Sequence, residues 1–292
     1  LYYLSMKKKR IMSNKSQHND QTNKNEKAPF LLANPQYYIS RATLKKALDN
    51  REFYPWFQPI VCSKNAKIVG CEVLARWERP GGVILPSEFI PSTEKYRLTT
   101  PLIIQLMHKT GYMVNKMRNI LPEGFHFGVN VCAMDITNPD FVCESIKLNN
   151  ILKKRGVGLI IEITERTPFS EHYETVATLS YLRDAGMLIA LDDFCTGHSS
   201  FKYIQQFAVD FLKIDKSFTH KYIKDDISRA IVNCIIGLAH KLNIKLIAEG
   251  IETERQAMEM TKQGVHYQQG YLYSFPVSEE HFMSEKFISR LT

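Results

Sequence analysis

Several apolar segments of this chain end in side chains that could bind a cation or a phosphate group. The first such segment is Cys71–Trp77, where strand alternation would place Glu72, Leu74 and Arg76 on one side. A strand with an acid and a base on one side faces either solvent or a polar site, and for one isolated strand solvent is the commoner case. The same pattern recurs down the chain, which favours a polar site.

The later apolar segments also end in acids, amides or a lysine. In a barrel of parallel strands, the carboxyl ends of the strands converge on one rim. Acids at those ends would therefore lie close together, and such a density of negative charge needs cations. Each residue alone has an ordinary alternative, such as a helix cap, a surface ion pair or a turn. The residues at these ends are Asn130, Glu162, Asp192, Asp193, Lys213, Asp215, Glu249 and Gln269.

The ligand types point to a hard metal ion. Carboxylate and amide oxygens suit Mg²⁺ or Mn²⁺, whereas the histidines show no H-E-x-x-H or H-x-H spacing for zinc. The adjacent Asp192 and Asp193 suit a site where one carboxylate bridges two metal ions, the usual arrangement for in-line displacement at phosphorus. Lys213 could orient the attacking water or neutralise a phosphate oxygen.

Alternating strands and helices must position these residues. Strands are expected near 54–62, 67–77, 124–132, 158–164, 187–193, 208–214, 244–249 and 265–270, with helical patterns between most of them. The first two strands form a hairpin, and the rest read as a parallel sheet buried on both faces. This predicts a (β/α)₈ barrel with an antiparallel first strand pair. An open doubly wound sheet is the alternative, weakened because no G-x-G-x-x-G opens a helix.

The basic excess lies at the amino-terminal end. Residues 1–50 hold ten Lys and Arg against three Asp and Glu, a net +7 that leaves about +1 of the total +8 for the remainder. We therefore expect a flexible basic leader over 1–36 and one domain over 37–292, with no nucleic-acid polymer as partner. The leader's contact with anionic lipid or nucleic acid is an open alternative. Six cysteines without a C-x-x-C pair favour reduced thiols in the cytoplasm, or at the inner membrane if a sensor or membrane segment precedes this chain.

The polar strand ends, taken together, resemble the EAL domain family of cyclic di-GMP phosphodiesterases. The resemblance runs in order over about residues 50–285. It rests on Gln58-Pro59-Ile60, Glu72–Trp77, Val129-Asn130-Val131, Glu162–Glu165, Asp192-Asp193-Phe194, Lys213-Ile214-Asp215, Glu249–Thr253 and Gln269–Leu272.

The resemblance implies a barrel that uses two Mg²⁺ or Mn²⁺ ions to hydrolyse cyclic di-GMP to linear pGpG. It also implies a homodimer through the loop and helix after Asp193. Lys213 would position water, Glu165 would anchor that loop, and both would be catalytic together with Glu72 and Glu249. The implied metal ligands are Glu72, Asn130, Glu162, Asp192, Asp193 and Glu249, and the implied substrate-side residues are Gln58, Leu74, Arg76, Asp215, Glu252 and Gln269.

The chain departs from the family pattern at a few positions. Val73 replaces the central alanine of the signature and should point away from the site. Cys195 replaces a glycine and His198 an aromatic residue in the loop after Asp193. Cysteine adopts a positive φ only with strain, so loop geometry and dimer coupling are in question. The alternative to an enzyme is a weak or inactive domain that binds cyclic di-GMP or a protein; retention of every implied ligand favours the enzyme.

Overall fold

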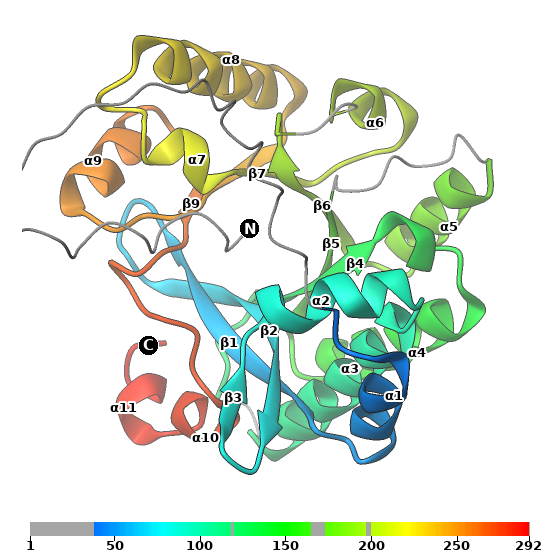
Figure 1. The fold of residues 1–292 in the computed structure, drawn as a ribbon. Coiled ribbons are helices and arrows are strands. Elements are labelled where there is room, and N and C mark those ends of the chain that lie inside the picture. Colours follow the sequence, from blue (N-terminus) through cyan, green and yellow to red (C-terminus); the bar gives the residue numbers. More distant parts are fainter. Residues whose placement is uncertain (1–37, 118–119, 165–172, 197–199, 292) are drawn as a thin grey trace, which may run out of the picture.

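A closed barrel of eight strands forms the centre of the molecule (Figure 1). The structure is a computed structural model that describes residues 38–117, 120–164, 173–196 and 200–291. The sheet order is β1-β9-β8-β7-β6-β5-β4-β2-β3, and β1 also pairs with β2, which closes the ring. The strands are β1 (Phe53–Cys62), β2 (Ile68–Arg79), β3 (Gly82–Ile84), β4 (His126–Cys132), β5 (Gly158–Thr164), β6 (Leu188–Phe194), β7 (Phe211–Ile214), β8 (Lys245–Ala248) and β9 (Tyr267–Gln268).

The first strand pair departs from a regular (β/α)₈ barrel as the sequence predicted. β1 runs antiparallel to β2 and to β9, whereas β2 and β4 to β9 run parallel to one another. The amino-terminal end of β1 therefore lies at the same rim as the carboxyl ends of the parallel strands. Beyond Val73, β2 leaves β4 and continues above the barrel, paired with β1 and β3.

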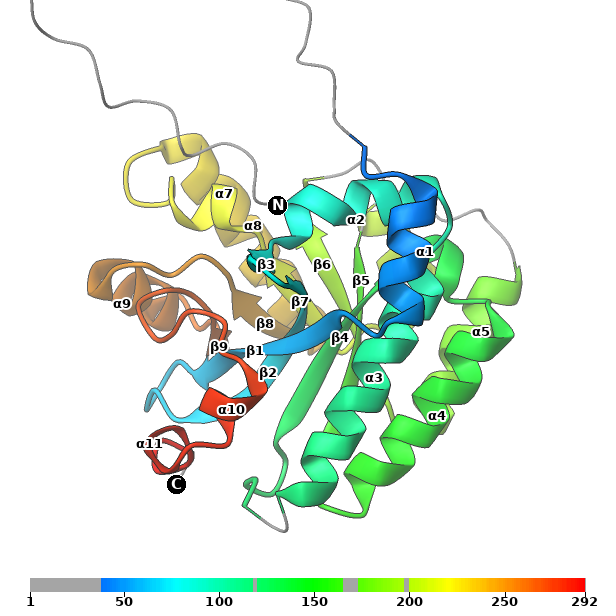
Figure 2. The same cartoon turned by 60° about the horizontal axis from the view of Figure 1, so that its bottom comes forward.

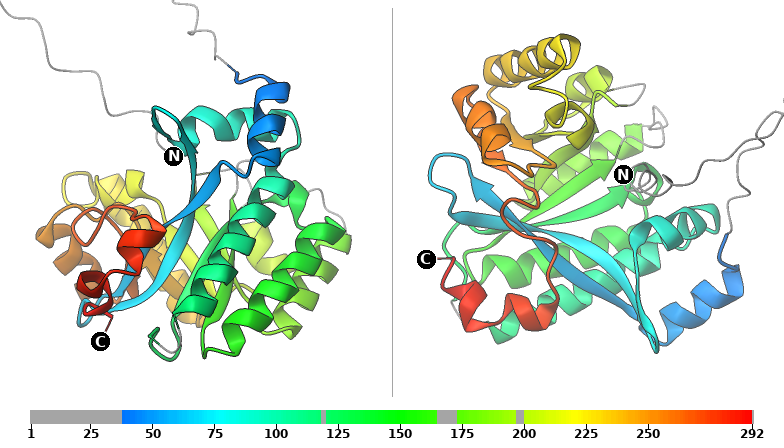
Figure 3. Two further views of the ribbon diagram at one scale, coloured as in Figure 1. Left: turned by 90° about the horizontal axis from the view of Figure 1, so that it is seen from below. Right: turned by 60° about the vertical axis from the view of Figure 1, so that its left-hand side comes forward.

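Helices cover the outside of the barrel, with α3, α4 and α5 side by side along one flank (Figure 2). The carboxyl-terminal helices α10 and α11 lie beside β1 (Figure 3). None of the described helices combines the length and apolar character needed to cross a membrane. The helices are α1 (Arg41–Asp49), α2 (Pro86–Lys95), α3 (Thr99–Lys116), α4 (Pro139–Lys153), α5 (Tyr173–Asp184), α6 (Ser200–Gln206), α7 (Lys216–Thr219), α8 (Asp226–Leu242), α9 (Glu254–Lys262), α10 (Glu279–Phe282) and α11 (Glu285–Ile288).

The strands have an inner and an outer apolar face. Most of the buried apolar side chains form one large core between the strands and the helices. A smaller inner cluster closes the barrel below the polar rim, because alternate residues of a strand point to opposite faces. The inner cluster consists of Ile60, Ile160, Ala190, Phe211 and Ile247.

Local signals explain most element boundaries. Ser40 accepts a hydrogen bond from the backbone N–H of Thr43, which fixes the start of α1. Asn243 takes a left-handed conformation and ends α8. The carboxyl-terminal segment forms two short helices, α10 and α11, because Ser284 caps a second start at α11. The leader 1–36 lies outside the described residues, so its boundary with the domain stays a prediction.

Candidate active site

The ammonium group of Lys213 lies fully buried inside a ring of four carboxylates. Its Nζ is 2.5 Å from Glu162 Oε2 and 2.7 Å from Glu249 Oε1. Asp192 Oδ1 lies at 3.2 Å and Glu72 Oε2 at 3.5 Å. These five residues come from β2, β5, β6, β7 and the residue after β8. The sequence prediction that polar strand ends meet at one rim is therefore confirmed.

The four carboxylates outnumber the one lysine, and two of them have raised pKa values. Burial, reinforced by Glu72 and Asp192 but opposed by Lys213, raises the pKa of Glu162 to about 8. Burial also raises the pKa of Glu249 well above its usual value, although Lys213 opposes it. The pKa of Lys213 rises because the surrounding carboxylates outweigh its burial. The ring holds more negative charge than one ammonium neutralises, so the charge is balanced by protons or by cations.

A compact group of acids lies on one side of this ring. Ligand oxygens of Asp192, Asp193 and Glu249 all lie within 4.8 Å of one another. Asp193 has a positive φ of 55°, and its backbone N–H donates to Asp192 Oδ1 at 3.0 Å. Burial, together with Asp192 and Asp215, raises the pKa of Asp193 to about 7. The backbone bend after Asp192 thus turns two successive carboxylates toward one point.

Amide side chains hold Glu72 on the other side of the ring. Asn130 Nδ2 donates to Glu72 Oε1 at 2.5 Å, and Gln269 Nε2 donates to Glu72 Oε2 at 2.7 Å. Gln269 Nε2 also donates to Gln58 Oε1 at 3.1 Å. Burial alone would raise the pKa of Glu72, but Lys213 and these two amides outweigh it, so its pKa is lowered. Lys213 and the two amides thus favour the ionised form of Glu72.

A glycine on β4 makes room for Glu162. A Cβ atom at Gly128 would lie 1.6 Å from Glu162 Oε1, so any side chain there would displace the carboxylate. Glu162 Oε1 is buried without a hydrogen-bond partner, and the same holds for Asp215 Oδ2. A buried carboxylate oxygen without a donor is the ligand that a cation would satisfy. The donor set of carboxylate and amide oxygens therefore fits hard divalent cations.

The sequence model of the EAL domain matches residues 41–276. The chain belongs to the EAL domain family. Among curated relatives, it is 41% identical over 250 residues to the cyclic di-GMP phosphodiesterase PdeL of Escherichia coli, which covers 85% of this chain and 69% of PdeL. It is 39% identical to the probable cyclic di-GMP phosphodiesterase PdeG of the same organism, covering 86% of this chain but 50% of PdeG. The chain thus spans about half the length of PdeG.

Solved EAL domains have the same fold. The PaMucR phosphodiesterase in complex with c-di-GMP superposes with a TM-score of 0.74 and 30% identity, covering 83% of this chain and 98% of that one. MucR of Pseudomonas aeruginosa is also a curated relative, named as a bifunctional diguanylate cyclase and cyclic di-GMP phosphodiesterase. The predicted barrel with its modified first strand pair is thereby confirmed as an EAL domain.

The remaining predicted site residues of this EAL domain lie outside the carboxylate ring. Arg76 and partly exposed Leu74 follow Glu72 on the same face of β2, and Arg76 Nη1 donates to the carbonyl of Ala75. Asp215, two residues after the ring lysine, caps α7 by accepting a hydrogen bond from the N–H of Ser217. Half-exposed Glu252 points instead toward α7, where its Oε1 is 3.6 Å from His220 Nε2. The structure therefore does not bring Glu252 into the ring, and its predicted substrate contact stays a prediction.

The loop after β6 contains the departure noted in the sequence. Cys195 has a φ of +68°, the left-handed conformation that favours glycine. Thr196 closes a turn here, since both its N–H and its hydroxyl donate to the carbonyl of Asp193. The expectation that this position requires a positive φ is confirmed. Glu165 and His198 lie outside the described residues, so their predicted roles stay predictions.

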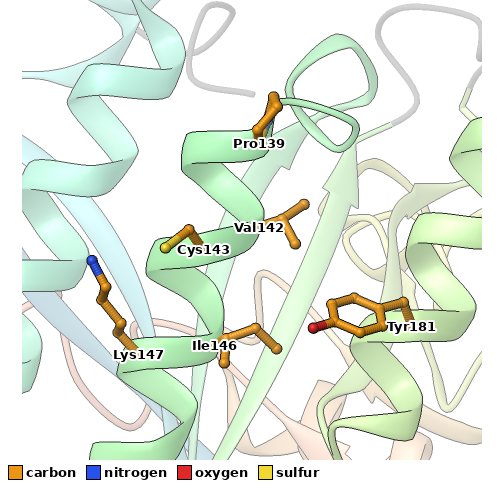
Figure 4. Close-up of a pocket in the computed structure, with 6 residues that line it drawn as sticks. All are labelled: Pro139, Val142, Cys143, Ile146, Lys147 and Tyr181. Carbon is orange, nitrogen blue, oxygen red and sulfur yellow. The ribbon is translucent and has the colours of Figure 1, made fainter.

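A groove lies between α4 and α5 on the outside of the barrel (Figure 4). This groove has a volume of about 460 Å³ and contains no member of the carboxylate ring. Its walls are mostly apolar, with one lysine and no carboxylate among the lining residues. The lining residues are Pro139, Val142, Cys143, Ile146, Lys147 and Tyr181.

Proposed function

We propose that this EAL domain hydrolyses cyclic di-GMP to linear pGpG and that the reaction requires two Mg²⁺ or Mn²⁺ ions. The observation that carries the proposal is the convergence of carboxylates from four places in the barrel on Lys213 and on one compact acidic group. Family membership and the names of the curated relatives support the substrate. A single phosphodiester-cleaving site accounts for every one of these features.

The metal ions would be held by the residues predicted as ligands. Bound divalent cations supply neutralisation of phosphate charge and a nucleophilic water at neutral pH. The buried oxygens without donors, Glu162 Oε1 and Asp215 Oδ2, support cation binding in this part of the barrel. The proposed ligands are Glu72, Asn130, Glu162, Asp192, Asp193 and Glu249.

The chain's own side chains supply the remaining steps. Lys213 keeps its proton, because its pKa is raised, and its Nζ donates to the attacking water and holds it in line with the phosphorus. Arg76 offers a fixed positive charge to the phosphate as charge develops in the transition state. Gln269, which donates to both Glu72 and Gln58, forms with Gln58 the wall against which the substrate lies.

Two further parts of the proposal concern the wider protein. The loop after Asp193 and the helix that follows it would form a homodimer interface, in line with the resemblance to the family. Residues 37–292 would form the catalytic domain, with 1–36 as a basic leader and the cytoplasm as the compartment.

The test is hydrolysis of cyclic di-GMP with Mg²⁺ or Mn²⁺ and chromatographic identification of the product. Glu72→Gln should abolish pGpG formation while the melting temperature stays near that of the wild type, because the amide keeps the shape of the side chain but loses its charge. Exposed Glu254, in the first turn of α9, provides the control Glu254→Gln, which should keep full activity. Full turnover by Glu72→Gln would refute the proposed role of the ring.

A second candidate function is binding of cyclic di-GMP without hydrolysis. The observation that favours it is Cys195 in a left-handed conformation next to Asp193, where backbone strain could misplace a ligand. Under this alternative, titration would show saturable binding of cyclic di-GMP while no pGpG forms at any concentration of Mg²⁺ or Mn²⁺. Restoration of turnover by Cys195→Gly would identify the loop as the cause.

A further inference from the structure

Trp56 lies on the face of β1 that lines the candidate site. Ile60, two positions after Gln58, belongs to the inner cluster of the barrel, so Gln58 and Trp56 share this inner face. Gln58 pairs with Glu72 across the hairpin, and Trp56 pairs with Leu74. The indole is therefore the next inner-face side chain above the carboxylate ring, toward the mouth of the barrel.

The indole is held in place but partly open to solvent. Its Nε1–H donates to Glu78 Oε1 at 3.1 Å, which fixes the plane of the ring. The guanidinium carbon of Arg76 lies 5.3 Å from the ring centroid, a cation–π distance. Both neighbours come from β2, so the hairpin itself orients the ring. An aromatic side chain fixed this way loses little conformational freedom when a flat ligand stacks on it.

The spacing along the strand matches the layout of a nucleotide. Two residues of extended chain separate Trp56 from the Gln58–Glu72 pair by about 6–7 Å. In a nucleotide, the sugar separates the base from the phosphate by a comparable span. A phosphate placed at the ring, with Arg76 beside it, would thus place its base over the indole.

We propose that Trp56 is a stacking platform for one guanine base of the cyclic dinucleotide. The inference rests on the proposed function, because it takes cyclic di-GMP as the ligand of the ring. It adds a residue that binds the base rather than the phosphate. Loss of this residue should therefore weaken substrate binding more than it slows the chemical step. Stacking of a base on an aromatic side chain contributes about 1–3 kcal/mol, a factor of about 5 to 150 in affinity.

The chain offers a direct spectroscopic test, because it has two tryptophans. Trp77 points to the opposite face of the hairpin and is 1% exposed, packed against Phe53 and Phe89. Indole fluorescence that changes on ligand binding should therefore come from Trp56. The Trp77→Phe variant leaves Trp56 as the single reporter. Rapid mixing with cyclic di-GMP and Mg²⁺ should quench this emission before product forms.

Kinetics of Trp56 variants provide the second test. Trp56→Ala should raise KM for cyclic di-GMP by about 5- to 150-fold, with kcat reduced much less, and Trp56→Phe should recover most of the loss because it keeps an aromatic face. Trp56→Leu, apolar but without such a face, should resemble Trp56→Ala. Tyr112→Ala is the matched control, since exposed Tyr112 on α3 also has a cation over its ring, Lys116 at 4.2 Å.

The outcomes separate this inference from the proposed function. Turnover by the wild type with unchanged KM in Trp56→Ala and no quenching would overturn the platform and leave the phosphodiesterase intact. Binding with quenching but no pGpG would overturn the hydrolytic function and support the platform. Absence of both binding and turnover would overturn both. A purely structural role predicts equal loss of melting temperature and kcat in Trp56→Ala and Trp56→Phe, with KM unaffected, and would also overturn the platform.

Discussion

Replacement of Lys213 by methionine should destabilise the metal-free domain strongly. The four carboxylates within 3.5 Å of Nζ would lose the cation that they surround. Removing one partner of a buried ion pair costs about 3–5 kcal/mol, because the remaining charge stays buried without compensation. For a domain of this size, 1 kcal/mol shifts the melting temperature by about 2–4 °C, so we expect a loss of about 6–20 °C.

The penalty should also depend on pH. Lys213 lowers the pKa of Glu162, which nevertheless stands at about 8, so the lysine-free site should hold its protons to a still higher pH. The unfolded chain releases the same protons near the ordinary value of 4.5. Above that value, raising the pH favours the unfolded chain of both proteins. The penalty of the substitution should therefore grow above about pH 8, where the wild-type site releases a proton that the lysine-free site still holds.

The assay is urea and thermal unfolding in EDTA and in Mg²⁺, compared with the exposed-lysine control Lys241→Met. Added cation should recover part of the lost stability, because it replaces the missing positive charge. The double variant Lys213→Met with Glu162→Gln should also recover stability, since it removes both partners of the shortest pair. A Lys213→Met protein within 1 kcal/mol of the wild type in EDTA at pH 8 would refute this account of the ring.

Three other outcomes follow from the geometry. Gly128→Ala should reduce turnover about 100-fold or more in a kinetic assay, because the new Cβ would displace the Glu162 carboxylate; near-normal rates would contradict the packing. Cys195→Gly should stabilise the protein by about 1 kcal/mol in urea melts, because the backbone strain that it removes exceeds the entropy that glycine adds to the unfolded chain. A loss of stability would show that the left-handed cysteine is not strained. Burial lowers the pKa of His126, so the unfolded chain takes up this proton first and the contribution of His126 to stability should fall below about pH 6.5. His126→Gln should remove that contribution, so that the variant loses less stability, or gains more, than the wild type between urea melts at pH 7.5 and 5.5.

Apolar runs made the barrel predictable from the sequence. Segments such as Gly158–Thr164 are buried on both faces, and their polar ends sit where parallel strands must converge. The convergence of strand ends also predicted that Glu162 and Lys213 lie close together. The elements that escaped prediction are short: three-residue β3 and four-residue α7 lack enough periodicity to be recognised.

The site was less predictable where it depends on shape. Gly128 carries no chemical group, so its part in making room for Glu162 appears only when β4 and β5 are paired. Trp56 is two positions before Gln58, and alternation alone would have put it on the site face, but an aromatic residue in a strand usually signals core. Glu252 is the opposite case: its sequence position predicted a place at the site, but the loop after β8 turns its side chain toward His220.

The reversed first strand has a consequence for how this domain is connected to other polypeptide. In a regular barrel the chain would enter at the end opposite the active site, but here α1 leads into the rim that carries the carboxylate ring (Figure 2). The helix has nine residues, about 14 Å of length. Whatever is fused ahead of Arg41 is therefore tethered beside the mouth, where a neighbouring module could hinder substrate entry or reshape the hairpin without a long-range relay.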